Sequence, residues 1–381
     1  MPDHSTDEQF LRRALDLARQ GVGLASPNPY VGAVIVDTQG RIAGTGFYTY
    51  DGVKHAEVHT LEHAGDKARG GTLYINLEPH SHQGRTPPCT DALIAAGIQR
   101  VVASMPDPNP KVSGRGFDKL RAAGVHVEVG CLEAEARRLN EAFARYIRHG
   151  VPLVTLKSAM TLDGKIAPPS QPTAKREAGI PAGGWITGKA ARANVQQQRH
   201  QSDAILVGVG TVLADDPLLT DRSGRARRRP LLRVVLDSHL RLPLESRLVQ
   251  SAGNDVLVFC SSDDPKKQSA LEAHGIRVEQ LPAAADGRPD IRGVLHRLGE
   301  LEITNVMIEG GAAVNGMALA SGVVDKVFLY YAPKIMGGAG SVSLATGFGQ
   351  LDQVPRIKHL YLHHFGEDVA VEGYLRDPYE E

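Results

Sequence analysis

Two short clusters of potential metal ligands constrain this chain more than any other feature. The first is HAEVH at residues 55–59, and the second is EPHSHQGRTPPC at residues 78–89. Imidazole nitrogen and thiolate sulfur are preferred zinc ligands, and a catalytic zinc site keeps one position for water. A glutamate two residues after a ligand histidine, as Glu57 is, can move protons on that water instead of holding the metal. Any fold of this chain must therefore bring the two clusters together.

Local patterns around the clusters indicate which residues meet. Residues 55–64 predict a helix, residues 72–77 predict a strand, and the double proline before Cys89 predicts the start of another helix. The candidate metal ligands are therefore His55, His80 and Cys89. A thiol in the first turn of a helix should have a lowered pKa because of the helix dipole, and we expect this for Cys89.

His59 is an alternative ligand, because it lies four residues after His55 on the same predicted helix. In the metalloprotease pattern H-E-x-x-H, however, the acid directly follows the first histidine, whereas Glu57 is in the third position here. We therefore interpret His59 and His63 as residues on the helix face without a chemical role.

The H-x-E pattern followed by a Pro-Cys segment is typical of zinc-dependent nucleobase deaminases. The blocks SPNPYVG, HAEVH and LEPHSHQGRTPPC resemble the deaminase domain of the bifunctional bacterial riboflavin-biosynthesis deaminase/reductase. That family usually has LEPCSH-x-G-[RK]-TPPC, so His80 replaces a cysteine, and Tyr48 replaces a histidine seven residues before His55. The resemblance implies zinc at His55, His80 and Cys89, with Glu57 as the catalytic acid and base. The implied substrate-binding residues are Asn28, Ser81, His82 and Arg85.

The second half of the chain carries landmarks of its own. The stretches LKSAMTLDGK, WIT, GVGTVLADDPLLT and VMIEGG resemble the reductase domain of the same enzyme, whose fold is similar to that of dihydrofolate reductase. Residues 208–210 lack the third glycine of the dinucleotide fingerprint, so no Rossmann domain is predicted. Residues 310–316 follow a strand and open a helix, where backbone amides can meet phosphate.

The resemblance implies that this half uses NADPH to reduce a phosphoribosyl pyrimidine. Lys157 and Glu309 are the candidate catalytic residues, because either could protonate or polarise the opened sugar. The implied cofactor-binding residues are Ala159, Trp185, Thr211, Asp215, Ser238, Gly311 and Gly316. The implied substrate-binding residues are Arg199, Leu219, Arg222 and Glu309. Residues 168–184 predict a long loop to which no role is assigned.

A chain of 381 residues is too long for one ordinary core, so two domains are expected. The order of helices and strands predicts the α/β class, with a boundary at Gly150-Val151-Pro152. We expect an N-terminal cytidine-deaminase-like αβα domain over residues 1–150 and a dihydrofolate-reductase-like α/β domain over residues 151–381. Residues 133–148 predict one long amphipathic helix.

Composition narrows the possible partners and the location. Lys+Arg and Asp+Glu both number 43, and a neutral chain argues against a general nucleic-acid binder. No apolar run approaches the length of a membrane span. The three cysteines, Cys89, Cys131 and Cys260, are far apart and odd in number, which predicts reduced thiols in the cytoplasm. We expect small-molecule phosphoribosyl pyrimidine substrates and a homo-oligomer.

The leading hypothesis is a bifunctional enzyme of riboflavin synthesis. It would use zinc to deaminate 2,5-diamino-6-(5-phosphoribosylamino)pyrimidin-4(3H)-one and NADPH to reduce the ribosyl side chain to ribityl. One alternative is a reductase whose deaminase domain has lost its metal site. Another is a nucleic-acid-binding relative of the tRNA deaminases, which zero net charge disfavours.

Overall fold

The computed structural model describes residues 4–84, 86–169, 184–346 and 354–380. The chain divides into two compact units, which we describe separately. The first comprises residues 1–149 with 226–229 and residue 381, and the second comprises residues 150–225 and 230–380. None of the helices in the described ranges is both long and apolar enough to span a membrane.

The first unit is built on a five-stranded sheet with the order β2-β1-β3-β4-β5. Strand β1 is antiparallel to both β2 and β3, whereas β3, β4 and β5 run parallel. The strands are β1 (Gly32–Val36), β2 (Ile42–Phe47), β3 (Thr72–Ile75), β4 (Arg100–Ala103) and β5 (His126–Val129). The helices are α1 (His4–Gln20), α2 (Ala56–Ala64), the short 3₁₀ helix η1 (Gly65–Ala68), α3 (Cys89–Ala95), α4 (Arg115–Ala122), α5 (Glu133–Leu139) and α6 (Glu141–His149).

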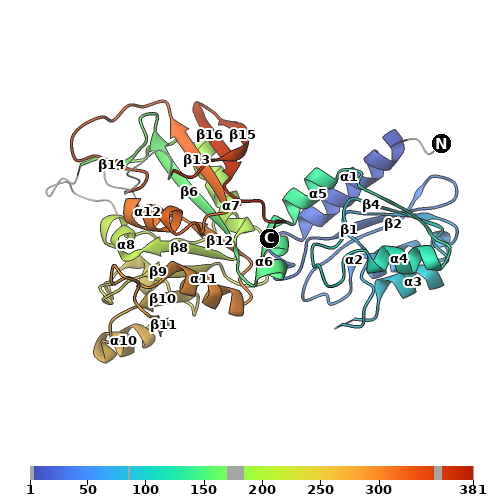
Figure 1. Cartoon of the computed structure of the whole chain (residues 1–381), viewed down its shortest axis with the longest axis horizontal. Coiled ribbons are helices and arrows are strands. Elements are labelled where there is room, and N and C mark those ends of the chain that lie inside the picture. Colours follow the sequence, from blue (N-terminus) through green and yellow to red (C-terminus); the bar gives the residue numbers. More distant parts are fainter. Residues whose placement is uncertain (1–3, 85, 170–183, 347–353, 381) are drawn as a thin grey trace. The chain divides into compact units, whose positions relative to one another are not determined.

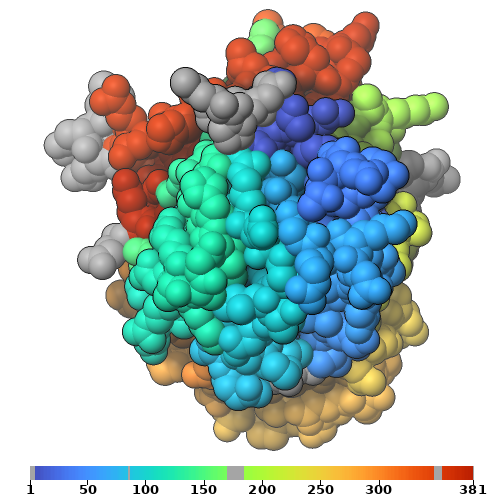
Figure 2. Space-filling view, turned by 90° about the vertical axis from the view of Figure 1, so that its right-hand side faces the viewer, coloured from blue at the N-terminus to red at the C-terminus, as the bar shows by residue number. Residues whose placement is uncertain are grey.

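Alternation of side chains along the strands produces two cores, one on each face of this sheet. Ala33 and Ile35 of β1 pack with α2, α3 and α4, whereas Val34 and Val36 pack with α1. Figure 1 shows this three-layer arrangement, with α1 and α5 on one side and α2, α3 and α4 on the other. Gly32 allows α1 to lie close to β1, because a Cβ there would be 2.2 Å from the Ala14 carbonyl oxygen. The space-filling view looks onto this unit, whose elements (blue to green) pack side by side (Figure 2).

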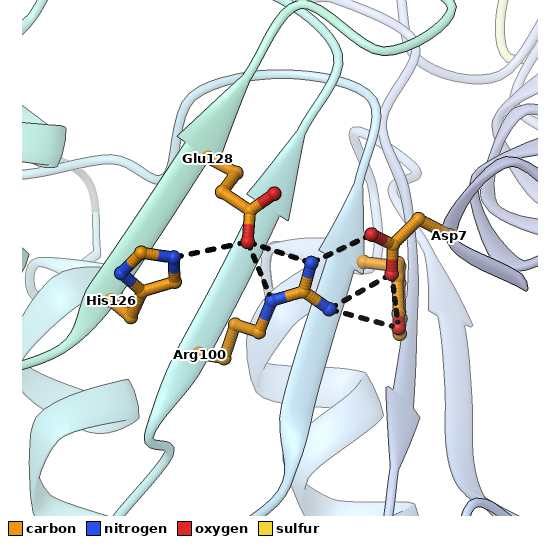
Figure 3. A network of polar contacts seen from close by, with 5 residues as sticks. Asp7, Arg100, His126 and Glu128 are labelled. Carbon is orange, nitrogen blue, oxygen red and sulfur yellow. Dashed lines mark hydrogen bonds and ion pairs between the residues drawn. The ribbon is translucent and has the colours of Figure 1, made fainter. Parts of the chain in front are cut away.

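A buried polar network ties the start of α1 to three strands. Arg100 on β4 contacts Asp7 of α1 at 2.6 Å and donates to Glu128 of β5 at 2.8 Å. Tyr74 on β3 donates to the same aspartate, and His126 contacts Glu128. Figure 3 shows the guanidinium lying between the two carboxylates. These contacts raise the pKa of Arg100, with the hydrogen bond to Asp7 as the largest cause.

The single helix expected over residues 133–148 is wrong, because the structure ends α5 at Leu139 and starts α6 at Glu141. Asn140 lies at the break, and its side chain is almost completely buried. The amide oxygen accepts from the backbone N–H of Tyr30 at 2.8 Å, and the amide nitrogen donates to the Tyr30 carbonyl oxygen at 3.1 Å. The backbone at Asn140 departs from helical geometry, with φ −106° and ψ 16°, where the side chain is held by the distant Tyr30 backbone. The apolar period does not reveal this contact.

The second unit is built on a nine-stranded sheet with the order β11-β10-β9-β8-β12-β6-β13-β16-β15. The strands from β11 to β13 are parallel to their neighbours, and β16 and β15 join antiparallel at the edge. Strands β7 and β14 form a separate pair. The strands are β6 (Leu153–Thr161), β7 (Lys165–Ala167), β8 (Ala204–Gly208), β9 (Leu232–Leu236), β10 (Val256–Cys260), β11 (Ile276–Gln280), β12 (Asn305–Ile308), β13 (Lys326–Ala332), β14 (Val342–Ser343), β15 (Lys358–Phe365) and β16 (Asp368–Tyr374).

Helices cover both faces of the nine-stranded sheet. One core packs against α11 and α12, and the other packs against α8, α9 and α10. Helix α7 packs on β13 and β16 in a smaller cluster. The helices are α7 (Lys189–Gln201), α8 (Val209–Asp215), α9 (Arg247–Gln250), α10 (Pro265–Glu272), α11 (Ile291–Glu300) and α12 (Ala312–Ala320). Because the central strands are parallel, all their carboxyl ends lie at one edge of the sheet.

Candidate active sites

The two sequence clusters meet in the first unit. His55 is the N-cap of α2, Cys89 is the first residue of α3, and His80 lies in the loop after β3. Their ligand atoms all lie within 4.8 Å of one another. Among the residues that the structure describes, this is the group of histidine, cysteine and carboxylate side chains that could hold a metal ion. His59 is not part of it, and His63 instead contacts the Thr45 carbonyl oxygen at 2.7 Å.

The ring of His55 has both nitrogens engaged. Its Nδ1 lies 3.2 Å from Cys89 Sγ, and its Nε2 lies 3.2 Å from Thr86 Oγ1. A ligand histidine is usually held by a hydrogen bond at the nitrogen that does not bind the metal. In this geometry His55 Nδ1 faces the other two ligand residues, and Thr86 contacts Nε2, the nitrogen that points away from them. The sequence analysis quotes Thr86 within the block but assigns it no role.

His80 is suited to metal binding as a neutral imidazole. Burial, together with the charges of His55 and His82, lowers the pKa of His80 to about 4. Its Nδ1 is buried, and no described residue offers it a hydrogen-bond partner. Buried polar atoms are rarely left unpaired, so this nitrogen is a plausible ligand atom on chemical grounds.

The expectation of a lowered thiol pKa at Cys89 is wrong. Burial raises the pKa of Cys89, and the neighbouring Glu57 carboxylate raises it further. These two effects outweigh the dipole of α3, which is a short helix. A thiolate at this position therefore requires a cation beside it, since metal binding and thiol deprotonation are coupled. Two imidazoles and a thiolate that needs a cation form a donor set that fits zinc.

The proposed proton carrier and the substrate-binding residues surround this cluster. Glu57 is buried in the first turn of α2, in contact with Cys89. Asn28 donates from Nδ2 to the Tyr48 hydroxyl at 2.6 Å instead of bonding its own backbone. Ser81 is partly buried and His82 is exposed, with the ring of His82 centred 4.2 Å from that of His80. Arg85 lies outside the described residues.

A second carboxylate near this site holds a loop in place, and the sequence analysis does not identify it. Glu78 accepts from the backbone N–H groups of Asp107, Gly114 and Gly116 at 2.7 to 3.0 Å. Asp107 itself accepts from the Asn109 amide. Burial raises the pKa of Asp107 to about 6; the Asn109 hydrogen bond opposes the shift, and the charge of Glu78 adds to it.

In the second unit, strand register brings the candidate catalytic residues together. Ile308 on β12 pairs with Leu156 on β6, so the next residues along, Glu309 and Lys157, are neighbours. Lys157 Nζ lies 3.5 Å from Glu309 Oε2. Arg199 on α7 donates to both oxygens of Glu309, at 2.8 and 3.0 Å. Burial alone would raise the pKa of Glu309, but the two cations outweigh it and lower the pKa to about 2.

The implied substrate residues lie around this ion cluster. Arg199 is buried and also donates to the Thr220 carbonyl oxygen at 2.9 Å. Leu219 is buried with a positive φ of 56°. Arg222 is exposed overall. Its pKa is lowered by the burial of part of the side chain and by the nearby charge of Arg199. Burial raises the pKa of Tyr330, and the charge of Glu309 raises it further. The Tyr330 hydroxyl donates to Asn194 at 2.6 Å.

A cavity of about 280 Å³ opens at the carboxyl ends of β8 and β9, beside the start of α12. Three of the implied cofactor-binding residues line it: Thr211, Ser238 and Gly311. Arg241 and Arg288 line it as well, and the sequence analysis does not identify either, because isolated arginines in loops give no pattern. A larger cavity, of about 380 Å³, lies at the opposite ends of β9, β10 and β11. Ligands of open α/β sheets bind at the carboxyl ends, so the smaller cavity is the candidate cofactor site.

The remaining implied cofactor residues do not line that cavity. Ala159 on β6 packs near Phe328 and Tyr330, and Asp215 ends α8. Trp185 is exposed, with the guanidinium of Arg192 lying 4.8 Å from its ring centre. Gly316 is buried inside α12, where a Cβ would lie 2.3 Å from the Thr346 carbonyl oxygen. Gly316 therefore serves close packing of the helix. Most of the predicted loop 168–184 lies outside the described residues.

Comparison with known proteins supports both halves of this description. The family model of the cytidine and deoxycytidylate deaminase zinc-binding region matches residues 4–105, and the RibD C-terminal domain model matches residues 152–371. The chain is 42% identical over 376 residues to the riboflavin biosynthesis protein RibD of Actinobacillus pleuropneumoniae, covering 98% of this chain and 96% of that one. It is 39% identical over 377 residues to RibD of Escherichia coli K12, covering 96% and 98%.

Solved structures agree with the sequence relatives. RibD of Acinetobacter baumannii, in its form 1, superimposes with a TM-score of 0.83 at 34% identity, covering 98% of this chain and 99% of that one. A diaminohydroxyphosphoribosylaminopyrimidine deaminase/5-amino-6-(5-phosphoribosylamino)uracil reductase of Thermotoga maritima superimposes with a TM-score of 0.82 at 36% identity, covering 97% and 99%.

Fold and sites together define an enzyme that joins a deaminase domain of the zinc-binding type to a reductase domain of the kind that uses a nicotinamide cofactor. The chain belongs to the RibD family and is a bifunctional deaminase and reductase of riboflavin biosynthesis. The expected fold, a cytidine-deaminase-like αβα arrangement followed by a dihydrofolate-reductase-like α/β arrangement, is confirmed.

The raised pKa of Asp107 predicts a pH-dependent loss of stability. An unfolded aspartate ionises near pH 3.9, whereas folded Asp107 ionises near pH 6. The folded state therefore binds more protons between these values, and this group lowers stability as pH rises through that window. Asp107→Asn removes the charge and keeps an oxygen for the Asn109 amide. In urea unfolding, the free energy of unfolding of the variant relative to that of the wild type should rise by on the order of 1 kcal/mol from pH 4 to pH 7. A difference that is constant with pH would contradict this account.

Proposed function

We propose that this chain uses zinc at His55, His80 and Cys89 to deaminate 2,5-diamino-6-(5-phosphoribosylamino)pyrimidin-4(3H)-one, and NADPH to reduce the ribosyl side chain of the product. The relative from Thermotoga maritima carries the names of both activities. The observation that carries the proposal is the convergence of three ligand atoms within 4.8 Å, with a buried carboxylate in contact with one of them. Intact ligands also argue against a deaminase domain that has lost its metal site.

The deaminase half requires an acid and base next to the metal. When bound, zinc supplies the Lewis acidity that makes hydroxide available from water near neutral pH. The Glu57 carboxylate takes one proton of the attacking water and passes it to the ring nitrogen. It then takes the proton of the new hydroxyl group and passes it to the amino group, which leaves as ammonia. Its burial excludes bulk water from this transfer. Asn28 and Ser81 lie at the rim of the cluster, where they can contact the pyrimidine.

The reductase half requires a group that polarises the sugar as the cofactor reduces it. With its pKa lowered to about 2, Glu309 is ionised at neutral pH and cannot donate a proton to the sugar. We therefore assign Lys157 as the residue that protonates or polarises the opened sugar. Glu309 positions Lys157 and Arg199, and these cations provide charge for a phosphoribosyl substrate.

The choice of NADPH is supported by the side chains that line the cavity beside α12. Ser238, Arg241 and Arg288 all line it. Arg241 Nε lies 3.9 Å from the buried Asp237 carboxylate, and Arg288 Nε lies 3.6 Å from that of Asp286. Two guanidinium groups and a hydroxyl are suited to a phosphate monoester such as the 2′-phosphate of NADPH.

The expected oligomeric state and cellular location of the protein stay predictions. Homo-oligomeric assembly and a cytoplasmic location are consistent with the composition, and no described feature tests them. Neither nucleic acid nor a membrane is needed by either proposed site.

The two activities should separate by mutation. Glu57→Gln removes the proton carrier and should lower deamination at least about 100-fold, while reduction of the deaminated intermediate is retained. Lys157→Met should do the reverse, with deamination retained. Both rates are measured on each purified variant, with the melting temperature as the control for folding. Loss of both activities in a folded Glu57→Gln protein would contradict two independent sites.

The ligand role of His80 is tested by metal content. His80→Ala should lose zinc, because two ligands remain, whereas His80→Cys should retain it, because thiolate is an equally suitable ligand. His59→Ala serves as the matched control and should keep its zinc, since His59 lies outside the ligand group. Zinc per chain is measured by atomic absorption after dialysis. Full occupancy in His80→Ala would refute the assignment.

The roles of Arg241 and Arg288 are tested by cofactor preference. A charge-assisted hydrogen bond contributes about 1.5–3 kcal/mol, so each change to Gln should lower kcat/KM for NADPH by about tenfold or more. The value for NADH, which lacks the phosphate, should change little. Arg277→Gln is the control, because this arginine is half exposed on β11 and contacts Glu279. Equal losses with both cofactors would show that the arginines do not recognise the 2′-phosphate.

A further inference from the structure

Tyr48 contacts both a residue proposed to bind the substrate, Asn28, and a proposed metal ligand, His55. It follows β2 directly, and its side chain is only 5% exposed. Its backbone N–H donates to the Val31 carbonyl oxygen at 2.9 Å, which fixes the residue beside the loop that carries Asn28. Its ring packs in the core with Ala25, Ala33 and Ala56. Tyr48 is therefore a rigid part of the site wall.

The hydroxyl of Tyr48 orients the amide of Asn28. Asn28 Nδ2 donates to the hydroxyl oxygen at 2.6 Å, a short hydrogen bond between two partly buried groups. Fixing the nitrogen of a planar amide also fixes its carbonyl oxygen, which must point away from Tyr48. Asn28 is partly exposed, so this oxygen is available as an acceptor for a donor group of a ligand. An aminopyrimidine ring carries such donors on its exocyclic amine and ring nitrogen.

The ring of Tyr48 also packs against the ring of His55. The two rings are perpendicular, at 89°, with their centres 5.6 Å apart. This edge-to-face geometry is favourable for aromatic pairs. His80 contacts the same histidine ring, with centres 4.9 Å apart. Tyr48 thus limits the movement of a ring whose two nitrogens already contact Cys89 and Thr86.

We propose that Tyr48 is a positioning residue of the deaminase, which directs the Asn28 carbonyl oxygen toward the pyrimidine and restrains His55. This inference rests on the proposed deamination of a diaminopyrimidine. It goes beyond that function by naming the group that sets the orientation of the substrate contact. It also gives a physical role to the position where the family pattern has histidine, since an imidazole nitrogen can likewise accept a hydrogen bond from the Asn28 amide.

The principal variant is Tyr48→Phe, which removes the hydroxyl and keeps the ring. The proposal predicts a KM for the diaminopyrimidine about tenfold higher, because a buried polar partner of Asn28 is lost. The zinc content and the melting temperature should be unchanged, and these report the metal site and the fold. The reductase rate, an activity of the second unit, should be unchanged as well. If Tyr48 acts through Asn28, Asn28→Ala and the double variant Asn28→Ala/Tyr48→Phe should have the same KM within about twofold.

Two further variants make the test decisive. Tyr48→His, which restores an acceptor, should have a KM closer to the wild type than Tyr48→Phe has. Tyr330→Phe is the matched control, because Tyr330 makes the same type of 2.6 Å bond, to Asn194, in the second unit. It should leave the KM for deamination unchanged.

The outcomes distinguish this inference from the proposed function. A wild-type KM in Tyr48→Phe, or an equal rise in Tyr48→His and Tyr48→Phe, would overturn the positioning role while deamination itself stands. Absence of deamination and of bound zinc in the wild-type protein would overturn the proposed function first. If Tyr48→Phe fails to fold, as a lowered melting temperature and lost zinc would show, Asn28→Ala is compared with Asn28→Ala/Tyr48→His. An equal KM would support action through Asn28, and a change in KM between them would overturn it.

Discussion

Parallel pairing of β-strands is the constraint on which both sites depend. Strands that run the same way end at the same edge, so the residues just after them are neighbours however far apart they lie in the sequence. In the first unit this places Glu78, after β3, beside Asp107, after β4. In the second unit it places Glu309 beside Lys157, although 152 residues separate them along the chain. The loops and helix starts at these edges then provide the chemistry.

Charges buried at such edges are retained only where partners surround them. The Glu309 carboxylate is stabilised by Arg199 and Lys157, and without them burial would favour its protonated form. The same rule applies away from the sites, where the buried carboxylate of Asp7 is paired with the partly buried Arg100. Removing one partner of such a pair leaves an unpaired buried charge, which costs about 3–5 kcal/mol. Functional and structural ion pairs in this chain therefore have the same physical basis and differ in whether a ligand can reach them.

Sequence reasoning succeeds here where residue type and spacing define the chemistry. The H-x-E and Pro-Cys spacing leads to His55, His80 and Cys89, and the structure brings their ligand atoms together. It fails where the outcome depends on the surroundings of a residue. The pKa of Cys89 is raised because burial and Glu57 act against the helix dipole, and neither effect is visible in a linear pattern. The break at Asn140 likewise depends on Tyr30, which is distant in sequence.

Residues that act through shape alone are the most difficult to predict. Arg241 and Arg288 line the same cavity, and nothing in the sequence links them. Gly316 has a structural reason to be glycine that its place in a glycine-rich segment does not reveal. In the structure the absence of its side chain makes room for the Thr346 backbone.

The ring of His55 lies between two residues, Tyr48 and His80, that both differ from the usual family pattern. This arrangement has a consequence for how such a site can be transplanted. A chimera that takes only residues 78–89 from a relative would combine the relative's residue at position 80 with the native Tyr48. A chimera that takes only the relative's residue at position 48 would combine it with the native His80. Because Tyr48 and His80 contact the same histidine ring, the two segments should be exchanged together in any such chimera.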